Sequence, residues 1–177
     1  MMDSLNNIKQ SSISEVLKSE KVLTYKVMGK SMEPIIVPNR DLVTIRLKDI
    51  NEVFQINDVV LYKSKGKLVL HRIVQEASDC NYVLLGDNCS QKEHGISSDD
   101  IIGKMVSFKH AGIHYDVNDS NYLKYVSVLR KNETKRMHRK LLYDIITQGL
   151  QFLPDNILFK VKGILKELIV YKISLDK

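Results

Sequence analysis

A serine and a histidine that lie forty residues apart are the two side-chain types, a nucleophile and a base, that can cleave a peptide bond. Ser31 is placed in a tight turn after an extended segment, and His71 lies in a later extended segment. A serine hydroxyl stays protonated at neutral pH and needs a base, and an ordinary imidazole has its pKa near neutrality. A lone histidine is more often a packed strand residue, so its pairing with Ser31 is what indicates nucleophilic catalysis.

The turn around Ser31 has residue types that favour an exposed nucleophile. It reads Gly29-Lys30-Ser31-Met32-Glu33-Pro34. Gly29 is expected to allow a close backbone approach, and Pro34 stiffens the exit from the turn. Ser31 is then directed outward, with backbone amides near its reaction centre. The candidate substrate-binding residues of this turn are Gly29, Met32 and Pro34, although Met32 fits core packing equally well.

Short extended segments must position these residues. Their alternating apolar and polar positions, separated by turn signals, predict a curled antiparallel β domain over residues 22–117. A short helical segment is expected before it within residues 1–21, where Ser12 and Glu15 have capping-box spacing. The predicted strands are 22–28, 42–47, 59–63, 67–74, 82–85, 101–109 and 113–117.

Residues 118–177 differ in both period and charge. Apolar residues recur at helical spacing, and this segment has 12 basic and 6 acidic side chains, which accounts for the whole net charge of +6. It is predicted to be a basic amphipathic helical appendage, which makes the fold mainly β with added helices (α+β). Contact with an anionic membrane surface and packing on the β domain both fit it. A nucleic-acid partner is disfavoured because no binding motif accompanies the charge.

Four motifs, in this order along the chain, resemble those of type I signal peptidases and the related self-cleaving repressors. The Ser31 turn resembles the Gly-x-Ser-Met-x-Pro signature, and residues 56–61 resemble a Gly-Asp-Val-Val strand opening with Asn57 in place of Gly. Gly86-Asp87-Asn88 resembles the Gly-Asp-Asn box, and residues 101–105 resemble the Ile-x-Gly-Lys strand after it. The resemblance covers about residues 22–117.

The histidine indicates one branch of this group. Bacterial type I enzymes and the repressors use a lysine where this chain has His71, and His-Arg is similar to the endoplasmic-reticulum and spore-former type. That resemblance implies that Ser31 is the nucleophile and His71 the general base. It also implies acidic support from Asp87 and from Glu93, which stands where an aspartate is expected. Of the two acids, Asp87 is the favoured partner.

The resemblance implies a serine endopeptidase that removes a leader or signal segment from a peptide bound as an extended strand. The alternative is a catalytically weak or inactive peptide-binding module that assists processing of a ribosomally made peptide. No metal or cofactor is predicted, because Cys80 and Cys89 form no metal-ligand spacing. The first residues resemble no signal peptide, and no run of about 18 apolar residues occurs. A cytoplasmic protein is therefore expected, without the family's anchor, and contact of residues 118–177 with the membrane would make it peripheral at that surface.

Overall fold

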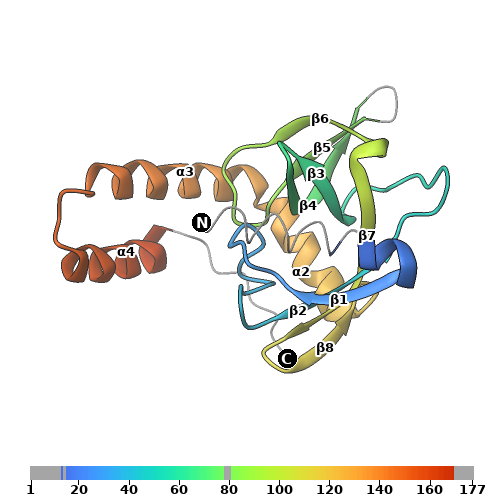
Figure 1. The fold of residues 1–177 in the computed structure, drawn as a ribbon. Coiled ribbons are helices and arrows are strands. Elements are labelled where there is room, and N and C mark those ends of the chain that lie inside the picture. The colour runs from blue at the N-terminus through green and yellow to red at the C-terminus, as the bar shows by residue number, and fades with distance from the viewer. Residues whose placement is uncertain (1–12, 14, 78–80, 170–177) are drawn as a thin grey trace.

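The computed structural model describes residues 13, 15–77 and 81–169. Its centre is one antiparallel sheet of eight strands, followed by three helices (Figure 1). This confirms the predicted fold class. The strands are β1 (Val22–Lys26), β2 (Leu42–Leu47), β3 (Val59–Ser64), β4 (Lys67–Glu76), β5 (Asn81–Leu85), β6 (Glu93–Ser97), β7 (Ile101–His110) and β8 (Ile113–Asp116).

The strand order brings distant parts of the sequence together. The path β1-β2-β7-β3-β4-β5-β6 inserts β7 between β2 and β3, and β8 pairs with β7. The β3–β4 hairpin is the centre of the site, because its register places Val60 opposite His71 and Val59 opposite Arg72. Side chains alternate between the two faces of a strand, so His71 and Arg72 point to opposite sides of the sheet.

Strand β6 was not predicted, because its sequence Glu-His-Gly-Ile-Ser has no regular apolar alternation. It pairs with β5, and Glu93 stands opposite Leu84 in that ladder. A short 3-10 turn, η1 (Ser98–Asp100), follows and is closed by a capping box between Ser97 and Asp100. Pairing with β5 thus gives Glu93 a fixed backbone position, where a loop was expected.

The first helix after the sheet is part of the core of the β domain. Helix α2 (Ser120–Lys131) buries Tyr122, Tyr125, Val126 and Leu129 in the same apolar cluster as β2 and β7. The Tyr122 ring lies 5.4 Å from that of Phe108, measured between ring centres. Residues 118–177 were predicted to form one appendage. Helix α2, the first helix of this segment, instead packs into the core of the β domain.

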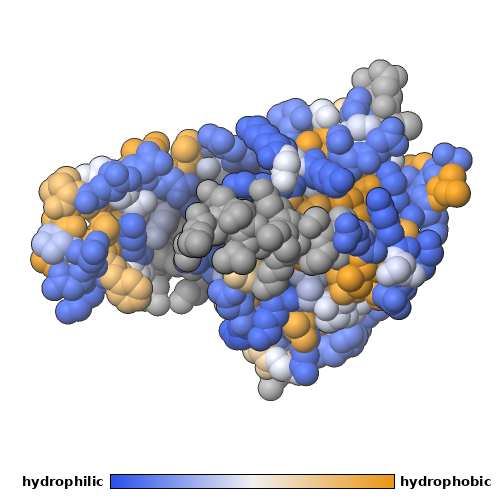
Figure 2. Space-filling view, in the orientation of Figure 1, coloured by the Kyte–Doolittle hydropathy of each residue, from blue (hydrophilic) through white to orange (hydrophobic). Residues whose placement is uncertain are grey.

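Helices α3 (Glu133–Gly149) and α4 (Asp155–Ile169) form a hairpin that extends away from the sheet (Figure 1). Hydrophobic residues are visible on its surface among hydrophilic ones (Figure 2). Phe152 and Phe159 are about four-fifths exposed. Within the described residues, no helix has the length and apolar character needed to cross a membrane.

Candidate active site

The Ser31 turn is held in place by the residues that follow the serine. Met32, Ile35 and Ile36 are almost completely buried in the main core cluster, and the Ile36 amide donates to the Met32 carbonyl at 3.0 Å. Ser31 itself is half-buried and lines a pocket of about 1100 Å³. Because core packing holds the residues that follow Ser31, the backbone of the serine has a fixed position at the pocket.

His71 lines the same pocket from strand β4 and is 7% exposed. Its Nδ1 atom lies 3.0 Å from the Tyr62 hydroxyl oxygen and 3.0 Å from Glu93 Oε1. The Tyr62 hydroxyl donates its proton to Glu93 Oε1 at 2.8 Å, so it can only accept from His71. We assign the imidazole proton to Nδ1 on this network, which leaves Nε2 as an acceptor.

Glu93 is positioned by side chains of strand β3 as well as by its own strand. Besides the Tyr62 bond, its Oε2 atom accepts a hydrogen bond of 3.2 Å from the Ser64 hydroxyl. Tyr62 and Ser64 are two residues apart and therefore lie on one face of β3. The carboxylate is thus oriented toward His71 by two hydroxyl groups.

Gly86 brings the serine turn and the histidine together. A Cβ atom on this glycine would lie 2.7 Å from the Ser31 carbonyl oxygen and 2.9 Å from His71 Nε2. The next residues fasten the loop to the turn: the Asn88 amide donates to the Ser31 carbonyl at 2.7 Å, and its side chain donates to the Lys30 carbonyl at 3.1 Å. The Nε2 side of His71 therefore faces the Ser31 turn, although no hydrogen bond joins Ser31 Oγ to His71 in the described part of the chain.

Asp87 faces away from His71. Both of its carboxylate oxygens accept hydrogen bonds from the Arg72 guanidinium, at 2.9 and 2.7 Å, and both side chains are about 1% exposed. The Tyr125 hydroxyl donates to Asp87 Oδ2 at 3.0 Å, and Arg72 donates to the Tyr122 hydroxyl at 2.9 Å. The expected preference for Asp87 over Glu93 as the partner of His71 therefore differs from the geometry, which places Glu93 against Nδ1.

Burial and charge act in opposite directions on the titratable groups of the pocket. Burial lowers the pKa of His71 below its ordinary value, and the negative charges of Glu93 and Asp87 oppose this only in part. The imidazole is consequently neutral at pH 7, as a general base must be. Burial also raises the pKa of the Cys89 thiol, which lines the same pocket, so this cysteine stays protonated and is a poor nucleophile.

The three candidate substrate-binding residues of the turn are placed differently from the expectation. Met32 is completely buried in the core, and Pro34 is exposed. A Cβ atom on Gly29 would meet no other atom within 4 Å, so the expected close backbone approach at this glycine is wrong. None of the three is among the described residues that line the pocket.

Two residues of the site were missed from the sequence. Tyr62 could have been found from the hairpin register, because it stands opposite Val69 and so lies diagonal to His71 on the same face. Arg136 of α3 donates to the backbone carbonyls of Gly86 and Asp87 and is buried. It had no such signal, since its contact depends on where the start of α3 lies relative to the Gly86-Asp87-Asn88 loop. No group of three or more potential metal ligands occurs among the described residues.

A sequence model of one protein family, described as Peptidase S24-like, matches residues 3–106. The chain belongs to the Peptidase S24-like family. The matched segment includes Ser31, His71 and Glu93, and it ends within β7, before α2 begins. Membership in this family supports placing the chain in the superfamily of signal peptidases and self-cleaving repressors. It also supports serine peptidase activity in general. No curated protein is similar enough in sequence to be matched.

Proposed function

We propose that this Peptidase S24-like protein is a serine endopeptidase that removes a leader or signal segment from a peptide substrate. Ser31 is the proposed nucleophile and His71 the general base, with Glu93 and Tyr62 holding the imidazole. One observation carries the proposal. Nδ1 of His71 is engaged by an acid and a hydroxyl, while Nε2 faces the Ser31 turn across Gly86.

The reaction follows from these positions. As Ser31 Oγ attacks the scissile carbonyl carbon, its proton passes to His71 Nε2, and the imidazolium is stabilised by Glu93. The tetrahedral intermediate collapses to an acyl-enzyme, and the leaving amine takes the proton from Nε2. A water molecule then loses a proton to Nε2 and attacks the ester carbonyl carbon. The second tetrahedral intermediate collapses as Nε2 returns this proton to Ser31 Oγ, which releases the acid product and restores free Ser31.

The oxyanion of the tetrahedral intermediate needs hydrogen-bond donors at the turn. The backbone N–H groups of Ser31 and Met32 donate to no acceptor within the described residues, so both are free for this task. Two amides from one tight turn are a common way to stabilise such an oxyanion. The family resemblance implies that the substrate peptide binds as an extended strand and has small residues on the acyl side of the scissile bond.

Cleavage of a peptide library, read by mass spectrometry, tests the proposal. We expect the wild-type protein to cut a subset of peptides, and Ser31→Ala and His71→Ala each to lose at least about 10³-fold in rate. Ser127→Ala, on an exposed position of α2, is the matched serine control and should cut at the wild-type rate. Equal cleavage by Ser31→Ala and wild type would remove Ser31 from the mechanism. Binding without cleavage by the wild type would favour the alternative, a peptide-binding module.

We also propose that the α3–α4 hairpin contacts an anionic membrane surface. Phe152 and Phe159 are exposed beside Lys160 and Lys162, a combination of apolar and basic groups that suits such a surface. Flotation with vesicles of anionic lipid should recover the wild-type protein. The double variant Phe152→Ser/Phe159→Ser should stay unbound, and equal recovery of both proteins would contradict the contact.

A further inference from the structure

Four lysines and two carboxylates line the pocket that contains Ser31 and His71. Both carboxylates are already engaged. Glu93 faces His71, and Asp144 forms an ion pair with Lys140 on α3. The remaining cationic groups are exposed and form no ion pair within the described residues: Lys30, Lys65 and Lys67.

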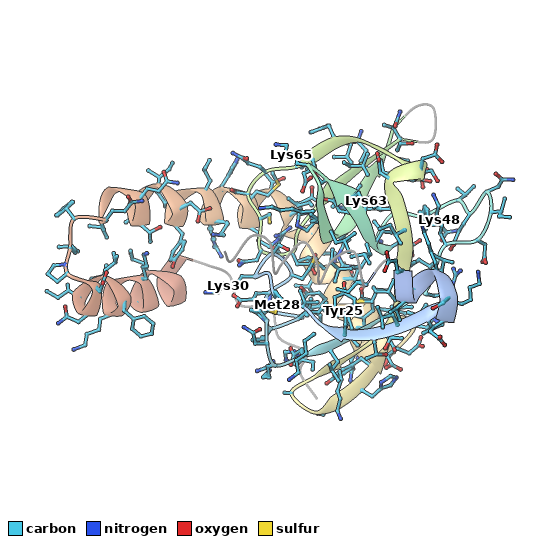
Figure 3. The ribbon with its side chains drawn as sticks, viewed as in Figure 1. Tyr25, Met28, Lys30, Lys48, Lys63 and Lys65 are labelled. Atoms are coloured by element: carbon cyan, nitrogen blue, oxygen red, sulfur yellow. The ribbon has the colours of Figure 1, made fainter. Side chains whose placement is uncertain are left out.

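These three lysines come from two separate segments that flank the site. Lys30 precedes the serine, Lys65 lies in the β3–β4 turn, and Lys67 is the first residue of β4. Figure 3 shows Lys30 and Lys65 on the side of the β domain from which α3 extends. Like charges gathered at the mouth of a concave site raise the local concentration of an oppositely charged ligand. The pocket therefore has three positive charges at its mouth that no carboxylate of the described residues neutralises.

Helix α3 gives the same pocket an apolar wall. Leu141 and Ile145 both line it, and their side chains are 44% and 58% exposed. They are four residues apart and so lie one above the other on one face of the helix. Apolar side chains that are this exposed lose further surface to solvent when a ligand covers them.

This wall is held against the Gly86-Asp87-Asn88 loop. Arg136 of α3 donates to the carbonyls of Gly86 and Asp87, and Lys92 forms an ion pair of 2.8 Å with Glu133 at the start of the helix. Met137 packs against the small apolar cluster of β4 and β5. Because α3 lies beyond the residues matched by the family model, this wall is a feature of this chain and not of the matched domain.

We infer that the peptide segment bound beside Ser31 is acidic and amphipathic. Its carboxylates face Lys30, Lys65 and Lys67, and its apolar side chains face Leu141 and Ile145. The inference rests on the proposed function, because it takes the pocket as the place where a peptide meets the serine. A nucleic acid fits less well, since no Phe, Tyr or Trp is among the described residues that line the pocket and bases would have no stacking surface.

Binding to the Ser31→Ala protein tests this without requiring turnover. The probe is a fluorescein-labelled peptide of about twelve residues that contains Glu and Leu, compared with the same peptide carrying Gln at every Glu. At low salt we expect the Glu peptide to bind about tenfold more tightly by anisotropy, because three exposed charge contacts each contribute modestly. The advantage should shrink at high salt.

Charge-matched variants locate the effect. Lys30→Gln/Lys65→Gln/Lys67→Gln should bind the two peptides equally. The control removes three exposed lysines outside the pocket, as Lys63→Gln/Lys109→Gln/Lys124→Gln, and should keep the preference. Leu141→Ser/Ile145→Ser should weaken both peptides by about tenfold and leave their ratio unchanged.

Equal affinity of the Ser31→Ala protein for the Glu and Gln peptides would overturn the inference. So would equally tight binding of a single-stranded oligonucleotide of the same charge, which would assign the three lysines to a nucleic acid. A preference for the Glu peptide together with no cleavage by the wild type would uphold the inference and refute the catalytic proposal.

Discussion

Two neighbouring residues of β4, His71 and Arg72, build two acid–base centres on opposite faces of one sheet. His71 faces the pocket and meets Glu93, which is about one-third exposed. Arg72 faces the core and meets Asp87, where both side chains are excluded from solvent. Each carboxylate is also bound by a tyrosine hydroxyl, Tyr62 on one side and Tyr125 on the other.

The two centres differ in whether the nitrogen group beside the carboxylate, guanidinium or imidazole, can lose its proton. The Arg72 guanidinium stays charged at every accessible pH, so its pair with Asp87 can only hold structure. The pKa of His71 is lowered by burial to below its ordinary value, so the imidazole can accept and return a proton. The same arrangement of nitrogen base, carboxylate and tyrosine therefore stabilises the fold on one face and suits the proposed proton transfer on the other.

The largest expected effect is on the core side. Asp87→Asn leaves the Arg72 charge buried without a full partner and should lower the free energy of unfolding by about 3–5 kcal/mol. Urea denaturation followed by circular dichroism measures this. Asp49→Asn, at an 82% exposed carboxylate, is the control and should cost less than about 1 kcal/mol. Similar losses for the two variants would contradict the structural role of the Asp87 pair.

The next effect is on the pocket side. Glu93→Gln keeps the shape of the side chain but removes the charge that stabilises the imidazolium, so kcat/KM should fall by about 10²-fold. The free energy of unfolding should change by less than about 1 kcal/mol. Glu76→Gln, at an exposed position of the same strand as His71, should change neither quantity. A loss of stability without a loss of activity would reverse the assignment of the two centres.

The two tyrosines give a crossed test of smaller size. Tyr125→Phe removes a hydrogen bond to a buried charge and should cost about 1.5 kcal/mol of stability with little effect on kcat. Tyr62→Phe removes the hydroxyl that orients both Glu93 and His71, and should cost about tenfold in kcat with little effect on stability. If both variants lose only stability, then Tyr62 has no positioning role.

The smallest effect is a shift in pH dependence. Because the pKa of His71 lies below its ordinary value of 6.5, kcat/KM should stay constant from pH 8 down to about 6.5 and decrease only at lower pH. Glu93 raises the pKa of His71, so in Glu93→Gln the acidic limb should move to still lower pH. A limb above pH 7, or no shift in the variant, would contradict the assignment of His71 as the base.

The sequence was sufficient for the fold class because strands such as β2 and β3 alternate or run apolar between clear turn signals. It also indicated Ser31, His71 and both acids, since each lies in a recognisable motif. It favoured Asp87 over Glu93 as the partner of His71, the reverse of the geometry, because the position of Glu93 depends on β6, a polar strand that is defined only by its pairing with β5. It did not show that α3 lines the pocket, because that placement is set by how the helix packs beside the Gly86-Asp87-Asn88 loop.

The Gly86-Asp87-Asn88 box joins three unrelated requirements in three consecutive positions. Position 86 has no room for a methyl group, because the Ser31 carbonyl and His71 Nε2 occupy that space. The backbone of Gly86 is not in the left-handed region, so the requirement for glycine is one of space alone. Position 87 must neutralise Arg72, and position 88 must fasten the serine turn. In a deep mutational scan, the three positions should therefore fail for different reasons. Substitutions at 86 should remove activity, those at 87 should reduce abundance, and those at 88 should reduce activity in a graded way.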